Sequence, residues 1–351
     1  MAEVEKKRIR VLQVGKFFPP ARGGIETVLR FLVEGLSQRD ELALETLVFN
    51  EKAETKTEVY KGVPITRLAR WEQLFSMPIA PAMYWWLRSR RYDIVHLHVP
   101  NPLASLCLLA TMPCDKLVVS YHSDVVKQKM LLRLYSPFQH RLLKKAHRIL
   151  VSSQGLIDHS PVLTDFKDKC RVIPFGIDPS VYMKKSQEDE EELQKVKKEF
   201  PNPFVLFAGR LVYYKGLQYL LKAIKDVDCH FVIAGDGPFY ASLRLLARGQ
   251  KEKVTFTGNI SDSRMRALMN SCELFVLPSI SASETFGLVQ LEAMAAGKAI
   301  INTNLPTGVP EVSLHEKTGL TIEPRNAQAL AQALNELIKD EEKRRKYGQA
   351  A

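Results

Sequence analysis

Residues 283–297 read SETFGLVQLEAMAAG and hold two glutamates, Glu284 before a predicted helix and Glu292 within it. The helix is expected to end at Gly297, because glycine readily adopts the left-handed conformation that follows many helix C-termini. Its buried face is predicted from apolar residues that recur at helical spacing, namely Leu288, Leu291 and Ala295.

The two glutamates can be interpreted in two ways. Glu292 lies on or beside the predicted buried face, where a carboxylate needs a partner or a polar ligand. Glu284 precedes the helix, where free N–H groups and the positive end of the helix dipole attract anions. Alternatively, Glu284 only complements the dipole and Glu292 is a solvated edge residue, as charged helix residues often are.

Two series of short apolar runs alternate with helical stretches along the chain. The first series covers residues 8–15, 43–49, 94–98, 117–122 and 148–152, and the second covers 204–208, 230–234, 254–257, 274–278 and 299–303. Such runs are typical of parallel strands with helices on both faces of the sheet. We therefore predict an α/β fold of two Rossmann-like, doubly wound domains, with ligands at the carboxyl ends of the strands.

The domain boundary is predicted from a polar stretch, residues 179–202, which contains an acidic run and ends with prolines. This stretch is too polar for a core and is interpreted as a linker. The N-terminal domain would then cover residues 1–178, and the C-terminal domain residues 203–351.

Candidate ligand contacts follow strands of the first series. Gly23 and Gly24 open a helix, an arrangement that can bind phosphate, although the pair could also form only a tight turn. His122 ends a strand, where a histidine can be functional or structural. His96 and His98 are interpreted as packing residues, because no carboxylate cluster accompanies them.

In the second series, Arg210 and Lys215 follow the strand at 204–208. Either cation can bind a diphosphate, Arg210 through its planar guanidinium group and Lys215 as a point charge, although both could be surface charges. Gly235 lies in a turn that lets the backbone approach a ligand and could otherwise be an ordinary loop residue.

These stretches together resemble the motifs of family 4 of the retaining nucleotide-sugar glycosyltransferases, whose two glutamates are separated by seven residues, as Glu284 and Glu292 are. The resemblance covers nearly the whole chain. Its other motifs are PARGGIE at 20–26, YHSD at 121–124, IPFGID at 173–178, AGR at 208–210 with KG at 215–216, and GDGP at 235–238. It implies the GT-B fold and transfer of a hexosyl group from a nucleoside diphosphate to an acceptor hydroxyl, with retention of anomeric configuration.

The resemblance also implies roles for residues. In an acceptor-binding N-terminal domain, Gly23 and Gly24 would lie beside the donor diphosphate and the acceptor, and His122 would contact the transferring sugar. In a donor-binding C-terminal domain, Glu284 would contact sugar hydroxyls and Glu292 the ribose. The remaining donor contacts would be Gly235, the base-binding loop with Ile260 and Asp262, and the N–H groups of Phe286, Gly287 and Leu288. Asp262 could instead cap a helix.

The negative charge on the leaving diphosphate would be stabilised by Arg210, Lys215 and the N–H groups at the start of the helix. Such an arrangement can replace a divalent metal, so no metal and no cofactor is expected. Front-face attack by the acceptor also requires no enzyme nucleophile.

Two features depart from the family pattern. Phe175 stands where asparagine or histidine is common, which puts a polar contact there in doubt. The sequence ends at Ala351, whereas family members usually continue into helices that cross back to the first domain. We therefore expect those crossing helices to be missing.

Composition, with 46% apolar and 25% charged residues, is that of a soluble globular protein. Five scattered cysteines indicate reduced thiols, and the charged first residues do not form a signal peptide. The longest apolar run, 102–113, is too short to span a membrane. These observations predict a cytoplasmic protein.

The net charge of +11 is concentrated in residues 1–178, where 27 lysines and arginines face 18 aspartates and glutamates. Residues 71–91 combine tryptophans with arginines, and residues 127–148 interleave leucines with basic residues. Both stretches would suit peripheral contact with the inner, anionic face of a membrane. The alternative is that the aromatic residues pack in the core and the basic residues form a solvated face.

The donor is expected to be GDP-mannose, because Asp262 could accept hydrogen bonds from guanine, with UDP-sugars as the alternative. The acceptor is expected to be a lipid-linked or cell-surface glycan. A sugar-nucleotide epimerase with the GT-B fold would need carboxylates that the first half does not match, and a polysaccharide synthase of the glycogen or sucrose type is usually longer. A nucleic-acid-binding protein would not need Arg210, Lys215, Glu284 and Glu292 together, so no nucleic-acid partner is expected.

Overall fold

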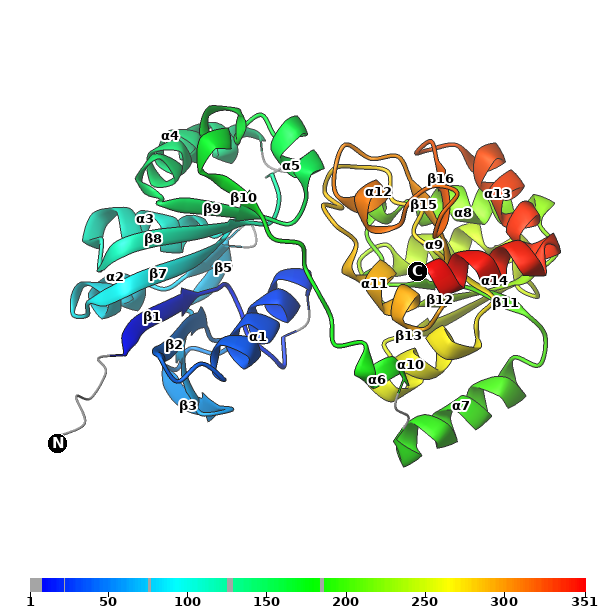
Figure 1. Ribbon diagram of the computed structural model, residues 1–351, viewed down its shortest axis with the longest axis horizontal. Coiled ribbons are helices and arrows are strands. Elements are labelled where there is room, and N and C mark those ends of the chain that lie inside the picture. The colour runs from blue at the N-terminus through cyan, green and yellow to red at the C-terminus, as the bar shows by residue number, and fades with distance from the viewer. Residues whose placement is uncertain (1–7, 22, 75–76, 125–128, 184–185) are drawn as a thin grey trace. The chain divides into compact units, whose positions relative to one another are not determined.

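The computed structural model describes residues 8–21, 23–74, 77–124, 129–183 and 186–351, so that Arg22, Phe75 and Lys127 of the sequence motifs lie outside the described residues. Contacts divide the chain into two compact units, Met1–Phe175 and Gly176–Ala351. Each unit contains one large sheet with helices packed on it (Figure 1). The predicted class, two doubly wound α/β domains, is confirmed.

The first unit is built on an eight-stranded sheet with the order β10-β9-β8-β7-β1-β2-β4-β3. The strands are β1 (Ile9–Val14), β2 (Leu42–Phe49), β3 (Lys56–Tyr60), β4 (Val63–Leu68), β7 (Tyr92–Val99), β8 (Cys114–Tyr121), β9 (Arg148–Val151) and β10 (Cys170–Val172). Only β3, at one edge, pairs in an antiparallel direction. Strands β5 (Glu72–Leu74) and β6 (Met77–Ile79) pair in an antiparallel direction and form a separate, two-stranded sheet.

Helices cover both faces of this sheet. They are α1 (Gly24–Leu36), α2 (Ala82–Arg88), α3 (Pro102–Thr111), α4 (Lys129–Lys145) and α5 (Gln154–His159). Alternate residues of β1 point to opposite faces, so Val11 packs in the cluster that contains Leu29 of α1, whereas Leu12 packs in the cluster that contains Leu108 of α3 and Leu142 of α4. The central strands are therefore buried on both sides.

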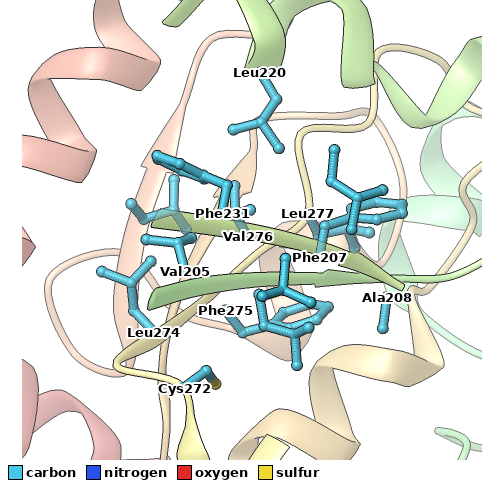
Figure 2. Close-up of a cluster of buried hydrophobic side chains, with 14 of the residues drawn as sticks. Val205, Phe207, Ala208, Leu220, Phe231, Cys272, Leu274, Phe275, Val276 and Leu277 are labelled. Carbon is cyan, nitrogen blue, oxygen red and sulfur yellow. The ribbon is translucent and has the colours of Figure 1, made fainter. Parts of the chain in front are cut away.

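The second unit has a six-stranded, fully parallel sheet with the order β13-β12-β11-β14-β15-β16. The strands are β11 (Phe204–Ala208), β12 (His230–Ala234), β13 (Val254–Gly258), β14 (Leu274–Val276), β15 (Ala299–Thr303) and β16 (Gly319–Ile322). Phe207 of β11 and Phe275 of β14 lie on neighbouring strands within one buried apolar cluster (Figure 2).

Nine α-helices of the described residues belong to this unit. They are α6 (Ser180–Met183), α7 (Gln187–Glu199), α8 (Leu217–Ala223), α9 (Tyr240–Leu246), α10 (Asp262–Ser271), α11 (Leu288–Ala295), α12 (Val309–Val312), α13 (Ala327–Lys339) and α14 (Glu341–Ala350).

The stretch expected to be a linker, residues 179–202, contains α6 and α7 and is part of the second unit. Helix α7 packs against α10. Its Leu193 and Val196 are buried in the core, and its Asp189 pairs with Arg266 of α10 at 2.6 Å. The polar composition reflects the exposed face of a surface helix, while two apolar residues three positions apart attach the helix to the unit.

The strand order reverses at one point in each sheet. In the first unit the chain runs from β1 to β2 on one side and from β7 to β8 on the other, and in the second unit β11 and β14 are the corresponding neighbours. Parallel sheets of this kind bind ligands outside the carboxyl ends of the strands at the point of reversal. Residues that bind ligand are therefore expected to lie near these two points.

Candidate active site

Lys215 and Glu284 form a buried ion pair at the reversal point of the second sheet. Lys215 follows β11 and Glu284 follows β14, and Lys215 Nζ lies 2.5 Å from Glu284 Oε2. Both side chains are only 10% exposed, and the hydroxyl of Ser279 donates a second hydrogen bond to the same carboxylate oxygen at 3.1 Å. Glu284 is therefore a paired, buried carboxylate, and the interpretation as a simple dipole-complementing charge is wrong.

A close approach of two loops brings this pair together. Gly216 has φ of +72°, and a Cβ at this position would lie 1.9 Å from the carbonyl oxygen of Pro278. Only glycine fits there, since both the left-handed conformation and the contact exclude a side chain. Next to it, the N–H of Ile280 donates to the carbonyl of Tyr214 at 2.8 Å.

Arg210 and Gly235 lie at the carboxyl ends of β11 and β12. Arg210 is exposed and follows Gly209, where a Cβ would lie 3.7 Å from Lys215 Nζ. Gly235 has φ of +126°, and a Cβ there would lie 2.1 Å from the carbonyl oxygen of Gly209. The structure thus brings the loops of Arg210, Lys215 and Gly235 to one edge of the sheet.

Helix α11 begins at Leu288, after Gly287, which has φ of +73° and offers no side chain to cap the helix. The buried residues of α11 are Gln290 and Ala293. The prediction from helical spacing is therefore wrong, because its three apolar residues are only half-buried. These are Leu288, Leu291 and Ala295. The expected end of the helix is confirmed, since Gly297 has φ of +69° directly after it.

Gln290 holds the loop before α11 and was not identified from the sequence. Its amide donates to the carbonyl of Phe286 at 3.1 Å, and its amide oxygen accepts from Asn302 at 2.9 Å. All of these atoms are buried, so the network fixes the start of the helix at the candidate diphosphate site. One signal was available in the sequence, because a glutamine flanked by apolar residues in a helix must be either exposed or fully hydrogen-bonded.

Glu292, four residues after Leu288, is partly buried. It hydrogen-bonds to the hydroxyl of Tyr182 on α6 and lies within electrostatic range of Asp262 on α10. Burial is the main cause that raises the pKa of Glu292, and the negative charge of Asp262 acts in the same direction. The alternative of a solvated edge residue is therefore wrong for Glu292.

The candidate base-binding loop precedes α10. Ser261 caps this helix by accepting a hydrogen bond from the N–H of Arg264 at 3.2 Å, so the alternative that Asp262 is the cap is wrong. Asp262 is exposed in the first turn of α10, and Ile260 packs partly against the core.

His122, at the end of β8, is 4% exposed and lies at the reversal point of the first sheet. Its ring stacks on the ring of Phe175 at a centroid distance of 5.4 Å. His122 therefore has an apolar contact at a position where asparagine or histidine is common in the family. Burial lowers the pKa of His122 to about 3, so the imidazole is neutral at physiological pH.

His96 and His98, at the end of β7, do more than pack. His98 Nδ1 is 2.9 Å from His122 Nε2, and His96 Nε2 is 2.8 Å from the hydroxyl of Ser120. Burial lowers the pKa of His96 to about 4 and that of His98 well below its usual value. The sequence-based interpretation of both residues as packing residues therefore omitted their hydrogen bonds.

Gly23 and Gly24 lie at the start of α1, where no side chain caps the helix. The loop before them is held by the buried Arg67 of β4, which donates to the carbonyls of Phe18 at 3.0 Å and Pro19 at 2.5 Å. Arg67 is also a residue that the sequence motifs did not identify.

No group of three or more His, Cys, Asp or Glu side chains that could hold a metal ion occurs among the described residues. Nor is any helix in the described part of the chain long and apolar enough to cross a membrane.

Two family models match the chain, glycosyl transferases group 1 over residues 188–351 and glycosyltransferase family 4 over residues 22–181. O-antigen chain mannosyltransferase C of Escherichia coli is 34% identical over 348 residues, which cover 97% of this chain and 92% of that protein. The GDP-mannose-dependent monoacylated alpha-(1-6)-phosphatidylinositol monomannoside mannosyltransferase of Corynebacterium glutamicum is 26% identical over 361 residues, with coverage of 97% and 92%.

Solved structures with the same fold include Anabaena HepE in complex with UDP. The two chains superpose with a TM-score of 0.77 at 20% sequence identity, over 97% of this chain and 93% of the other. This similarity supports the GT-B arrangement of two Rossmann-like domains.

Proposed function

Since the chain belongs to the group 1, family 4 glycosyltransferases, we propose that it transfers a mannosyl group from GDP-mannose, with retention of configuration, to a hydroxyl group of a lipid-linked or cell-surface glycan. The observation that carries the proposal is the buried Lys215–Glu284 pair at the reversal point of the second sheet. A cation and a carboxylate at this position can bind the diphosphate and the sugar of one donor.

In the proposed reaction the bond between sugar C1 and the diphosphate oxygen breaks, and C1 forms a bond to the acceptor oxygen on the same face. The proton of the acceptor hydroxyl passes to the departing diphosphate. Lys215 has three N–H donors, so its contact with Glu284 leaves donors for a phosphate oxygen. Arg210 and the N–H groups of Phe286, Gly287 and Leu288 would stabilise the same developing charge.

The remaining residues are assigned to the parts of the donor. Glu284 would accept hydrogen bonds from sugar hydroxyls, Glu292 from the ribose, and His122 would contact the transferring sugar. Gly23, Gly24 and Gly235 would bring backbone close to the diphosphate. No metal ion and no cofactor is required by this assignment.

Guanine is the base that Asp262 favours, because a carboxylate can accept from both N–H donors on the Watson–Crick edge of guanine. Asp262 lies within electrostatic range of Glu292, so base and ribose contacts would be adjacent. The names of the relatives from Escherichia coli and Corynebacterium glutamicum also point to mannosyl transfer.

We expect GDP to raise the unfolding temperature more than UDP or ADP at equal concentration, because a ligand that binds only the folded state stabilises it. A thermal-shift series measures this preference. Asp262→Asn should remove the advantage of GDP without changing the effect of UDP, and Asp228→Asn, an exposed carboxylate of the same unit, should leave both unchanged. A larger shift with UDP in the wild-type protein would assign the donor to the UDP-sugars.

An exposed face of α4 supports the proposal that the acceptor lies on a membrane surface. Leu134 and Phe138 are 71% and 47% exposed, and Arg141 and Lys145 continue the same face at helical spacing. The opposite side of the helix, with Leu142 and Leu143, is buried. Apolar residues next to basic residues suit an anionic interface.

The first unit is therefore expected to bind anionic vesicles at low salt, since each basic residue near such a surface contributes about 1 kcal/mol. Co-sedimentation with anionic and neutral vesicles measures the binding. Lys144→Glu with Lys145→Glu should release the protein, whereas Lys225→Glu with Lys251→Glu, two exposed lysines of the second unit, should not. Equal retention on both kinds of vesicle would instead indicate a soluble acceptor.

A further inference from the structure

Three buried side chains of the first unit form a chain of hydrogen bonds that ends at His122. Gln13 of β1 is 1% exposed, and its Oε1 lies 3.2 Å from Nε2 of His98. His98 of β7 is also 1% exposed, and its Nδ1 lies 2.9 Å from Nε2 of His122. The three residues come from neighbouring strands at the point where the strand order reverses.

The position of each proton follows from the chemistry of these groups. An amide oxygen can only accept, so Nε2 of His98 must carry a hydrogen and donate to Gln13. A neutral imidazole has one N–H, so Nδ1 of His98 is an acceptor and Nε2 of His122 must donate to it. His122 is then left with an unprotonated Nδ1.

The ring of His122 is also fixed in orientation. The ring of His98 is nearly parallel to it, with a centroid distance of 5.2 Å and an interplanar angle of 18°, and the ring of Phe175 stacks with it at 5.4 Å and 27°. His96 does not belong to the chain, because its Nε2 bonds to Ser120 instead. Both the tautomer and the plane of His122 are thus determined by its neighbours.

We propose that Gln13 and His98 are positioning residues that hold His122 as the Nε2–H tautomer, with Nδ1 available to accept a hydrogen bond from a hydroxyl group of the transferring sugar. The contact between Nδ1 and the sugar hydroxyl rests on the proposed glycosyl transfer, whereas the tautomer does not. It makes His122 a neutral acceptor and not an acid, so a donor sugar without that hydroxyl should be a poorer substrate.

The tautomer can be measured without any assay of transfer. Long-range ¹H–¹⁵N spectra of ¹⁵N-histidine-labelled protein are expected to show a protonated Nε2 and an unprotonated Nδ1 for His122 at neutral pH. Gln13→Leu removes the acceptor of the His98 N–H, and His98→Phe removes the acceptor of the His122 N–H. In both variants His122 should therefore show a mixture of tautomers. His96→Phe removes a neighbouring histidine of β7 that is also buried and lies outside the chain, so this matched control should retain the single tautomer.

Transfer is then measured in the same variants. We expect kcat to fall roughly 10-fold or more in Gln13→Leu and His98→Phe, with unchanged KM for the acceptor, and to be nearly normal in His96→Phe. A wild-type His122 protonated on Nδ1, or a tautomer that survives both disruptive variants, would overturn the positioning role. A changed tautomer with normal kcat would overturn the acceptor role of Nδ1. Absence of transfer by wild-type protein with every donor would refute the proposed function and leave the tautomer result standing.

Discussion

Lys215→Met and Arg210→Ala are each expected to lower kcat for glycosyl transfer roughly 100-fold or more, but only Lys215→Met should also lower the unfolding temperature. Arg210 is exposed, whereas Lys215 is buried against Glu284 at 2.5 Å. Removing one partner of a buried pair leaves the other charge uncompensated, which costs about 3–5 kcal/mol. Thermal unfolding and steady-state kinetics on the same preparations measure both effects.

A double variant separates the two roles of Lys215. Lys215→Met combined with Glu284→Gln removes both buried charges and should recover much of the lost stability without recovering kcat. Lys251→Ala removes one exposed lysine of the same unit and should change neither quantity. Nearly normal kcat in both Lys215→Met and Arg210→Ala would contradict the assignment of these cations to the diphosphate.

The central strands could be predicted from the sequence because burial on both faces requires an apolar residue at nearly every position. Strand β11 is the clearest case, since all five of its residues are buried. Strand β3 was missed, because it lies at the edge of its sheet and its residues are exposed or half-buried, so no apolar run marks it.

The contacts of the site could be predicted less well than its residues. Lys215 and Glu284 were both identified, but they lie on loops after different strands, and only the strand order brings them together. The buried face of α11 was predicted wrongly because apolar spacing ignores Gln290, whose hydrogen bonds to Phe286 and Asn302 make its burial favourable.

The hydrogen bonds between Gln13, His98 and His122 also could not be predicted from the sequence. His98 and His122 were each visible at a strand end, but periodicity gives no information about which polar side chains face each other across neighbouring strands. Gln13, in the middle of an apolar run, is the partner that fixes the protons, and it carried no motif. Hydrogen-bonded partners of candidate residues are therefore the part of a site that a single sequence reveals least.

The two glutamates of the α11 region are expected to respond oppositely to neutralisation. Glu284→Gln loses the ion pair with Lys215 and should lower the unfolding temperature at pH 7. Glu292→Gln should raise it, because burial raises the pKa of Glu292 above its usual 4.5. An acid whose pKa is raised on folding destabilises the folded state increasingly as the pH rises from 4.5 through the raised value.

The stability gained in Glu292→Gln should therefore be present at pH 7 and disappear below about pH 4.5, where the carboxyl is protonated in both the folded and the unfolded state. Thermal unfolding at several pH values measures this difference. Tyr182→Phe provides the matched control, since it removes the hydrogen bond that opposes the shift and should raise the pKa of Glu292 further. A Glu292→Gln variant less stable than wild type at pH 7 would contradict this account of the buried carboxylate.

GDP binding should also distinguish the two glutamates, with the larger loss in the Glu292→Gln variant. Hydrogen bonds to a charged group contribute about 1.5–3 kcal/mol, so Glu292→Gln should weaken calorimetrically measured binding of GDP roughly 10- to 100-fold. Glu284→Gln should bind GDP with nearly wild-type affinity and lose kcat instead, because GDP has no sugar hydroxyls for this residue to contact. If Glu292→Gln binds GDP as tightly as wild type, the ribose contact must belong to another residue. If Glu292→Gln instead combines higher stability with weaker GDP binding, Glu292 is a partly buried carboxylate that serves ligand binding and lowers the stability of the fold.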